Sequence, residues 1–283
     1  CRHKKTRFIP AGAGNRRANQ YVQQAIPVHP RWRGEQKSLF ALLMRSNGSS
    51  PLARGTVHGP ELKYSRALLL VADQVEALLA GYDGRNIDRI GQRLDSYADI
   101  LDDWAAHVAR GMFADVDTKN RRFWRSMSQE IGVQMARQLA ETDIGVTVTQ
   151  SLDAQVQLIK SLPRHAAEQA HEYVREAALK GQRASDIADR IMALGGITRR
   201  RAVLIARTET SRFSTELLKA RAQTVGSTGY TWRTASDSDV RPSHKLMSGR
   251  HVPWGSPPTL DGMTGHAGCL PHCRCYPEPV IPD

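Results

Sequence analysis

The feature that most constrains the fold is helical periodicity over most of the chain, from about residue 62 to residue 225. Apolar residues recur there at spacings of three and four, as in helices that bury one face. The first stripe consists of Leu68, Ala72, Val75, Leu78 and Leu79, and Gly81 follows it as a stop signal. Aromatic residues make up only 6% of the chain. This composition and this periodicity predict a helical bundle rather than a β-sandwich.

Capping, glycine and proline signals predict where the other helices begin and end. We expect them at about 86–107, 119–139, 151–162, 164–179, 185–194 and 198–222. Pro163 is expected to separate two of them and the pair Gly195-Gly196 to end another. Ser185 and Thr198 are expected to act as N-caps.

Large apolar side chains on these helices are expected to pack in the core. The stripe of the 86–107 helix consists of Ile90, Leu94, Tyr97, Ile100, Leu101 and Trp104. Phe123 and Trp124 belong to the stripe of the next helix. Aromatic residues at helical spacing are far more often core residues than cofactor or nucleic-acid contacts.

Positive charge is concentrated at the start of the chain. The net charge of +12 would ordinarily suggest a nucleic-acid partner. However, residues 1–56 contain eleven of the 40 Lys and Arg residues and only one of the 28 acidic residues, Glu35. The rest of the chain is therefore close to neutral.

Three fragments of this basic segment recur about every 20 residues, at 7–15, 28–35 and 48–56. They resemble the three forward-frame translations of the palindromic repeat of enterobacterial CRISPR arrays. A repeat unit of about 61 nucleotides would shift the reading frame once per repeat and give the observed order. We interpret residues 1–57 as translated repeat DNA, which we expect to be non-native and disordered. An ordinary basic arm is the alternative, and the coding DNA distinguishes the two.

The last hundred residues have a different character and carry four short motifs. The last long predicted helix contains Ala206-Arg207-Thr208-Glu209. A predicted strand at 230–233 contains Trp232, and Asp239-Val240-Arg241-Pro242-Ser243-His244 follows it. A Gly/Pro-rich stretch over 249–268 then leads to Cys273-Arg274-Cys275.

This ordered set resembles the phage Mu F-like minor head, or head morphogenesis, family over residues 181–283. That family carries an A-R-T-E helix, a strand with Trp, a D-x-R-x-x-H turn and a terminal C-R-C strand in the same order. The resemblance implies a minor capsid component that lies near the portal and assists head assembly.

The pattern and the resemblance together predict a mainly α fold, in which a helical bundle precedes a small α+β C-terminal domain with short strands. The expected segments are 1–57 for the translated repeat, 62–180 for a helical domain and 181–283 for the Mu F-like domain.

Residues of the family motifs are expected to form a polar network that holds the C-terminal domain together. They are Arg207, Thr208, Glu209, Asp239, Arg241 and His244. Glu209 is expected to pair with Arg212 or with Arg241 and so to fix the strand against the helix. The alternative is a catalytic carboxylate with His244 as acid and base. The structural role is favoured, and no catalytic residue is predicted.

Cysteine and histidine residues near the C-terminus are candidate metal ligands, namely His244, Cys269, His272, Cys273 and Cys275, with His266 as a further donor. These residue types bind zinc, although their spacing is not that of a paired C-x2-C site. On a strand, Cys273 and Cys275 would face one side and His272 the other. Reduced thiols in a small core and a Cys269–Cys275 disulfide are the alternatives. Zinc is therefore the candidate cofactor, and none is required.

The sequence predicts a phage or prophage minor head protein without enzymatic activity. Its helical part would bind portal, major capsid or scaffold protein, in the host cytoplasm during assembly and in the virion head afterwards. A zinc-dependent hydrolase or nuclease built on His244 and the Cys/His cluster is the first alternative. A basic packaging protein that binds genome DNA is the second. No run of about 18 apolar residues occurs, so no membrane association is expected.

Overall fold

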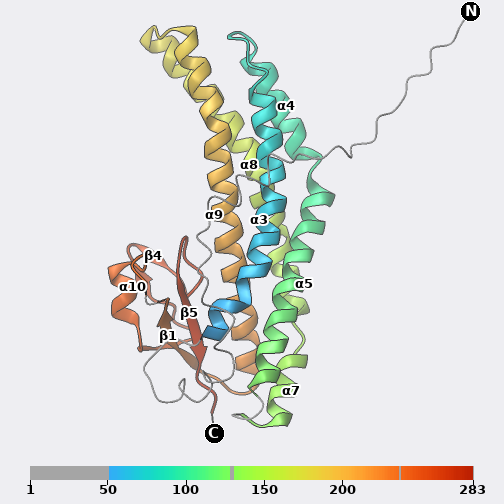
Figure 1. Ribbon diagram of the computed structural model, residues 1–283, viewed down its shortest axis with the longest axis vertical. Helices are drawn as coiled ribbons and strands as arrows, with labels where there is room; N and C mark the ends of the chain where they lie inside the picture. Colours follow the sequence, from blue (N-terminus) through green and yellow to red (C-terminus); the bar gives the residue numbers. More distant parts are fainter. Residues whose placement is uncertain (1–50, 128–130, 236, 283) are drawn as a thin grey trace, which may run out of the picture. The chain divides into compact units, whose positions relative to one another are not determined.

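The computed structural model describes residues 51–127, 131–235 and 237–282, which lie in one compact unit, Ser49–Asp283. The unit is mainly helical, with short antiparallel strands near its C-terminal end (Figure 1), and this confirms the predicted fold class. The long helices are α3 (Pro51–Leu79), α5 (Asp102–Ser126), α8 (Gly145–Lys180) and α9 (Ala184–Thr224). The shorter helices between them are α4 (Ile87–Asp99) and α7 (Val133–Glu141).

Helix α3 begins at Pro51, inside the segment interpreted as translated repeat DNA. Residues 1–50 lie outside the described residues, so the array interpretation remains a prediction. The predicted boundary near residue 181 also remains a prediction, because the described residues fall within a single unit.

The helical core forms where α3 packs against α5 and α9, and where α8 packs against α4, α5 and α9. Phe113 on α5 and Phe213 on α9 meet there with ring centroids 4.1 Å apart. The stripe predicted from Leu68 to Leu79 is buried throughout. Trp124 is buried, and Trp104 and Phe123 are partly buried against apolar clusters, as the core interpretation predicted.

Two predicted helices have different bounds in the structure. The helix expected at 86–107 is interrupted after Asp99, and α5 begins at Asp102. Asp102 and Asp103 favour this start, because acidic groups in a first turn stabilise the positive end of the helix dipole. The break leaves Ile100 76% exposed, although the stripe had placed it in the core. The helix expected at 119–139 was also wrong: α5 continues to Ser126, and α7 starts after Gly132, whose φ is 81°.

Two predicted helix breaks do not occur. Pro163 lies inside the continuous helix α8, where it is buried among apolar residues. Gly195-Gly196 lies inside α9, which runs from Ala184 without interruption, so Ser185 and Thr198 are not N-caps. A Cβ on Gly195 would lie 2.8 Å from Cγ of Glu76, so this glycine lets α3 approach α9 closely. Packing therefore outweighed the local preference of these residues. The stop at Gly181 is confirmed, with a left-handed φ of 62°.

The strands form a small region after α9. Strand β1 (Gly229–Thr234) is the centre of an antiparallel sheet, with β2 (His251–Pro253) and β5 (Cys275–Pro279) on its two sides. The short helix α10 (Pro242–Met247) lies between β1 and β2 in sequence. A hairpin pairs β3 (Thr259–Leu260) with β4 (Met263–Thr264) through Asp261-Gly262, where both φ angles are positive.

An apolar cluster joins this sheet to the helices. Trp232 and Tyr230 of β1 are fully buried, and they cluster with Trp254, with Leu139 of α7 and with Leu218 of α9. Helix α9 also contacts β5 directly. The C-terminal strands are therefore held against the end of the longest helix. Among the described helices, none is long and apolar enough to cross a membrane.

Candidate functional site

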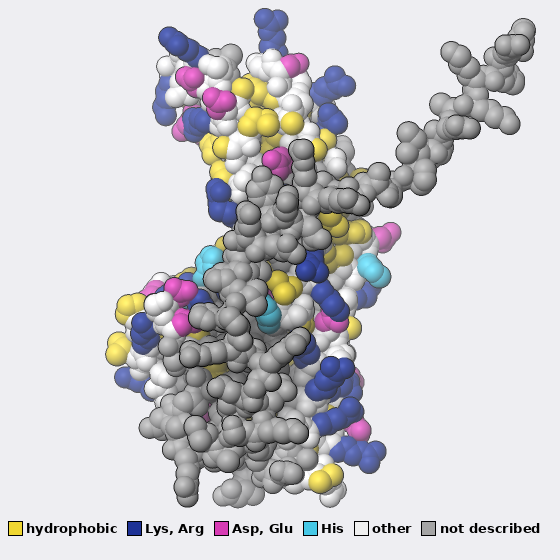
Figure 2. Space-filling view, in the orientation of Figure 1, with side chains coloured by type: hydrophobic (Ala, Val, Ile, Leu, Met, Phe, Trp, Pro, Cys, Tyr) yellow, Lys and Arg dark blue, Asp and Glu magenta, His cyan; other side chains and the backbone are white. Residues whose placement is uncertain are grey.

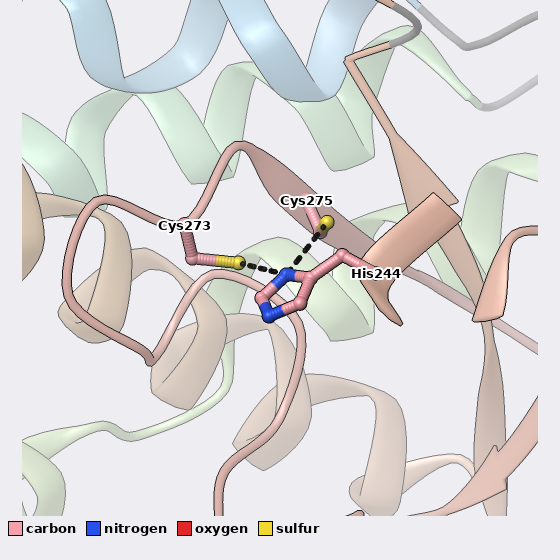
Figure 3. A group of neighbouring side chains, drawn as sticks. All are labelled: His244, Cys273 and Cys275. Carbon is pink, nitrogen blue, oxygen red and sulfur yellow. Dashed lines mark hydrogen bonds between the residues drawn. The ribbon is translucent and has the colours of Figure 1, made fainter. Parts of the chain in front are cut away.

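The candidate site consists of three side chains that converge beside the sheet: His244, Cys273 and Cys275 (Figure 3). The Sγ atoms of Cys273 and Cys275 lie 3.5 Å and 3.4 Å from the same atom, Nδ1 of His244. The exposed fraction of each residue is below 10%: 1% for His244, 8% for Cys273 and 6% for Cys275. Soft ligand atoms thus gather in a place that solvent hardly reaches.

Short local structures position these three side chains close to one another. Pro242 starts α10 with a φ already suited to a helix, and His244 follows in the first turn. Cys275 is the first residue of β5, and Cys273 precedes it by two positions. Extended backbone sends alternate side chains to opposite sides, so both sulfur atoms face His244 while Arg274 points elsewhere.

Arg274 faces the turn that leads into α10. Its guanidinium pairs with Asp239 at 2.5 Å and with Asp237 at 2.7 Å. Arg241 donates from Nη2 to the carbonyl oxygen of Pro271 at 2.5 Å. Each polar member of the D-x-R-x-x-H motif therefore has its own partner on or just before the C-R-C segment. The D-x-R-x-x-H motif and the C-R-C segment therefore pack against each other, although about 30 residues separate them in the sequence.

The other candidate metal ligands lie apart from this cluster. His272 is exposed and has a positive φ of 54°. His266 is buried, and its Nδ1 lies 3.2 Å from the hydroxyl of Tyr230. Cys269 interacts with the side chain of Thr215 on α9. All three described cysteines are free thiols, so the structure contains no Cys269–Cys275 bridge.

The thiols of the site differ in their electrostatics. A hydrogen bond from Cys275 lowers the pKa of the Cys273 thiol to about 5. The same hydrogen bond, together with burial, raises the pKa of the Cys275 thiol well above its ordinary value. Burial raises the pKa of the separate Cys269 thiol to about 12. The Cys273–Cys275 pair therefore shares one proton, whereas Cys269 stays protonated.

The A-R-T-E residues on α9 face other helices instead of the C-R-C segment. Glu209 is buried, accepts a hydrogen bond from Nε2 of Gln155 at 2.7 Å and pairs with Arg212 at 3.0 Å. Arg212 is one of the two partners expected for it, and Arg241 is not in contact. Tyr64 on α3 donates to Oε1 of the same Gln155 at 3.0 Å. This chain of contacts joins α3, α8 and α9.

The remaining two residues of that motif have weaker contacts. Arg207 lies 3.7 Å from Glu61 on α3. Thr208 is buried, and its hydroxyl has no hydrogen-bond partner among the described residues. The expected single network is therefore divided into one group within the helices and one between α10 and β5.

One segment links the two groups. Arg212 donates to the carbonyl oxygen of Cys269 at 3.1 Å, and Thr215 donates to the carbonyl oxygen of Ala267 at 2.9 Å. A Cβ on Gly268 between them would lie 2.8 Å from the Thr215 hydroxyl. Helix α9 thereby positions the loop that leads into the C-R-C segment.

Sequence reasoning missed several of these contacts. The motif gives Arg274 only as the middle of C-R-C, although alternation along a strand could have placed it opposite the sulfur atoms. Gln155 and Tyr64 gave no signal, because a polar residue within an amphipathic helix is ordinarily exposed.

Comparisons with known proteins follow the same part of the chain. Residues 168–277 match the family described as "Phage Mu protein F like protein". An uncharacterized protein of Haemophilus influenzae is 29% identical over 182 residues, which is 62% of this chain. The chain spans only 39% of the length of that relative. No solved structure matches.

The family match confirms the resemblance that the ordered motifs indicated. The matched residues also cover the elements that carry the D-x-R-x-x-H and C-R-C motifs, from the end of α8 to β5. Residues 168–277 of this chain are therefore similar to the phage Mu F-like family.

Proposed function

We propose that this chain is a minor head protein that acts near the portal during phage head assembly. The observation that carries the proposal is the family match over residues 168–277, the part that contains all four ordered motifs. In the structure these motifs join elements to one another: Glu209 joins helices, and Asp239, Arg241 and His244 join α10 to the C-R-C segment. Such contacts suit a rigid structural part better than a substrate site.

The helical part would bind the portal, major capsid or scaffold protein. Several large apolar side chains of this part face solvent, among them Leu70 (62% exposed), Ile100 (76%) and Leu179 (84%). We expect partner contacts to involve some of these exposed apolar side chains.

The rival roles gain less support from the described residues. Figure 2 shows Lys and Arg side chains among Asp and Glu side chains along the edge formed by α5 and α7. Three ion pairs involve charged residues of α5 and α7, namely Lys63–Asp115, Arg121–Asp117 and Arg137–Glu141. A surface of paired charges attracts DNA weakly. For a hydrolase, His244 would have to reach a substrate, and it is only 1% exposed.

Co-expression with the portal, major capsid and scaffold proteins of the same phage tests the proposal. We expect the chain to be captured with the tagged portal protein and to sediment with procapsids. Ile100→Glu and Leu246→Glu form a matched pair, because the two residues are 76% and 72% exposed but lie in the helical part and on α10. The helical variant should weaken capture more. A folded chain that associates with neither portal nor procapsids would refute the proposed function.

A further inference from the structure

The cluster of His244, Cys273 and Cys275 is not explained by docking alone. The ion pairs of Arg274 and the hydrogen bond of Arg241 already hold the turn before α10 against the C-R-C segment. Three soft ligand atoms nevertheless lie within 4.8 Å of one another at the centre of this junction. A purely apolar contact would fill the same space without placing three polar atoms out of reach of water.

The spacing of the ligand atoms suits zinc. Tetrahedral zinc has Zn–S bonds of about 2.3 Å and Zn–N bonds of about 2.0–2.1 Å, which set a sulfur and a nitrogen ligand about 3.6 Å apart. The two observed Sγ–Nδ1 separations are 3.5 Å and 3.4 Å. Both sulfur–nitrogen separations are thus close to the zinc value, and all three ligand atoms lie within 4.8 Å of one another.

Hydrogen bonding accounts for only part of this arrangement. Nδ1 of a neutral imidazole has either one lone pair or one hydrogen, so it can serve one of the two sulfur atoms at a time. Figure 3 shows both sulfur atoms directed at this same nitrogen. A cation between the three atoms would use one lone pair from each of them at once.

The side chains around the three ligand atoms favour a metal that binds sulfur and nitrogen. The nearest acidic side chains of the turn, Asp237 and Asp239, are occupied by Arg274. The set of ligands therefore contains no carboxylate, which argues against calcium and magnesium. Two thiolates and an imidazole match zinc.

We propose that Nδ1 of His244 and the Sγ atoms of Cys273 and Cys275 bind one zinc ion, which fastens α10 to the start of β5. The site takes three protein ligands, and Cys269 and His272 do not belong to it. This inference does not depend on the role in head assembly, because a zinc clasp would stabilise the C-terminal region in any function.

Metal analysis of the full-length chain tests the proposal. The reduced protein is stripped with a chelator, loaded with zinc and dialysed, and bound zinc per chain is measured by mass spectrometry. We expect a value close to one. Replacement of zinc by cobalt should give the charge-transfer absorption of thiolate ligands and the visible bands of tetrahedral cobalt. A reduced, folded chain that binds no zinc would overturn the proposal.

Variants then identify the ligands. Cys273→Ser and Cys275→Ser should each lose zinc to a chelator that the unaltered chain resists. Cys269→Ser is the matched control and should retain zinc, because that thiol contacts Thr215 instead. An equal loss in Cys269→Ser would overturn the assignment of three ligands. Circular dichroism of each variant shows whether it has folded.

A measurement without variants covers the case in which a serine variant does not fold. Zinc should protect Cys273 and Cys275 of the unaltered chain from alkylation, as peptide mass spectrometry would show. The reactivity of Cys269 should change less. Equal alkylation of Cys273 and Cys275 with and without zinc would contradict the proposal.

Discussion

Arg221 on α9 is completely buried and pairs with Asp117 on α5, its Nη2 lying 2.5 Å from Oδ1 of that carboxylate. Asn120 accepts a hydrogen bond from the other terminal nitrogen of the same guanidinium. Burial lowers the pKa of Arg221, and the hydrogen bond that its guanidinium donates to Asp117 opposes that shift. Because Arg221 lies in the last turn of α9, the pair joins α5 to the end of α9 that precedes β1.

Removal of this guanidinium should be costly. We expect Arg221→Met to lower the free energy of unfolding by about 3 kcal/mol, because Asn120 and Oδ1 of Asp117 lose their buried partner and only Oδ2 of Asp117 keeps its pair with Arg121. Arg137→Met is the control: its pair with Glu141 is exposed, at 76% and 50%, and its loss should cost less than about 1 kcal/mol. Urea unfolding of both variants measures the difference. Equal stability of the two would show that the buried pair is not a main support of the fold.

Glu209 offers a test of whether the A-R-T-E motif supports the fold. Glu209→Gln should lower the free energy of unfolding by about 1.5–3 kcal/mol, the usual range for a hydrogen bond to a charged group. The reason is its burial between Gln155 and Arg212. Glu168→Gln, at an exposed position on α8, should change stability by less than about 0.5 kcal/mol. Chemical denaturation monitored by tryptophan fluorescence measures the stability of both variants. A Glu209→Gln protein as stable as the unaltered chain would contradict the structural role.

Gly268 should tolerate no side chain. Its φ is 87°, and an added Cβ would lie 2.8 Å from the Thr215 hydroxyl. Gly262 is the matched control, because its φ of 76° is also positive but no atom lies within 4 Å of an added Cβ. Backbone strain of about 1–3 kcal/mol is common to both alanine variants, whereas crowding adds about 1–3 kcal/mol to Gly268→Ala alone. Thermal and urea unfolding of the two variants should differ by that second amount, and identical values would mean that the loop moves away freely.

The sequence predicted the class of fold well because the apolar stripes are long and regular. The stripe from Leu68 to Leu79 and the strand around Trp232 lie where they were expected. Helix breaks were predicted poorly. Pro163 and Gly195 are stop signals in isolation, but both are enclosed by neighbouring helices whose contacts outweigh the local cost.

The candidate site was only half predictable, for a geometric reason. The motifs identified His244, Cys273 and Cys275, whereas spacing alone could not show that Cys269 and His272 face other surroundings. The pairing of Arg274 with Asp239 spans 35 residues, and contacts at such separations depend on how the chain folds back. Local sequence signals do not show how the chain folds to bring such distant residues together.

His266 should make stability depend on pH. Burial lowers the pKa of this histidine, and the charge of Lys219 lowers it further. The unfolded chain, with an ordinary histidine pKa of about 6.5, then binds a proton more readily than the folded chain. This contribution to stability is therefore complete above about pH 6.5 and is lost as the pH falls from there toward the pKa of the folded state. In structural terms, protonation places a hydrogen on Nδ1, which lies 3.2 Å from the hydroxyl of Tyr230 and can then only donate to it.

The measurement compares free energies of unfolding in urea at about pH 7.5 and about pH 5.5, either side of that ordinary value. A chelator in both buffers keeps metal binding out of the comparison. His266→Gln retains an acceptor for Tyr230 without titrating, so its loss of stability at the lower pH should be smaller than that of the unaltered chain. His251→Gln, at an exposed position on β2, should show the full loss. The same pH dependence in all three proteins would mean that His266 is not the group that titrates, and that the acid sensitivity of the C-terminal region arises elsewhere.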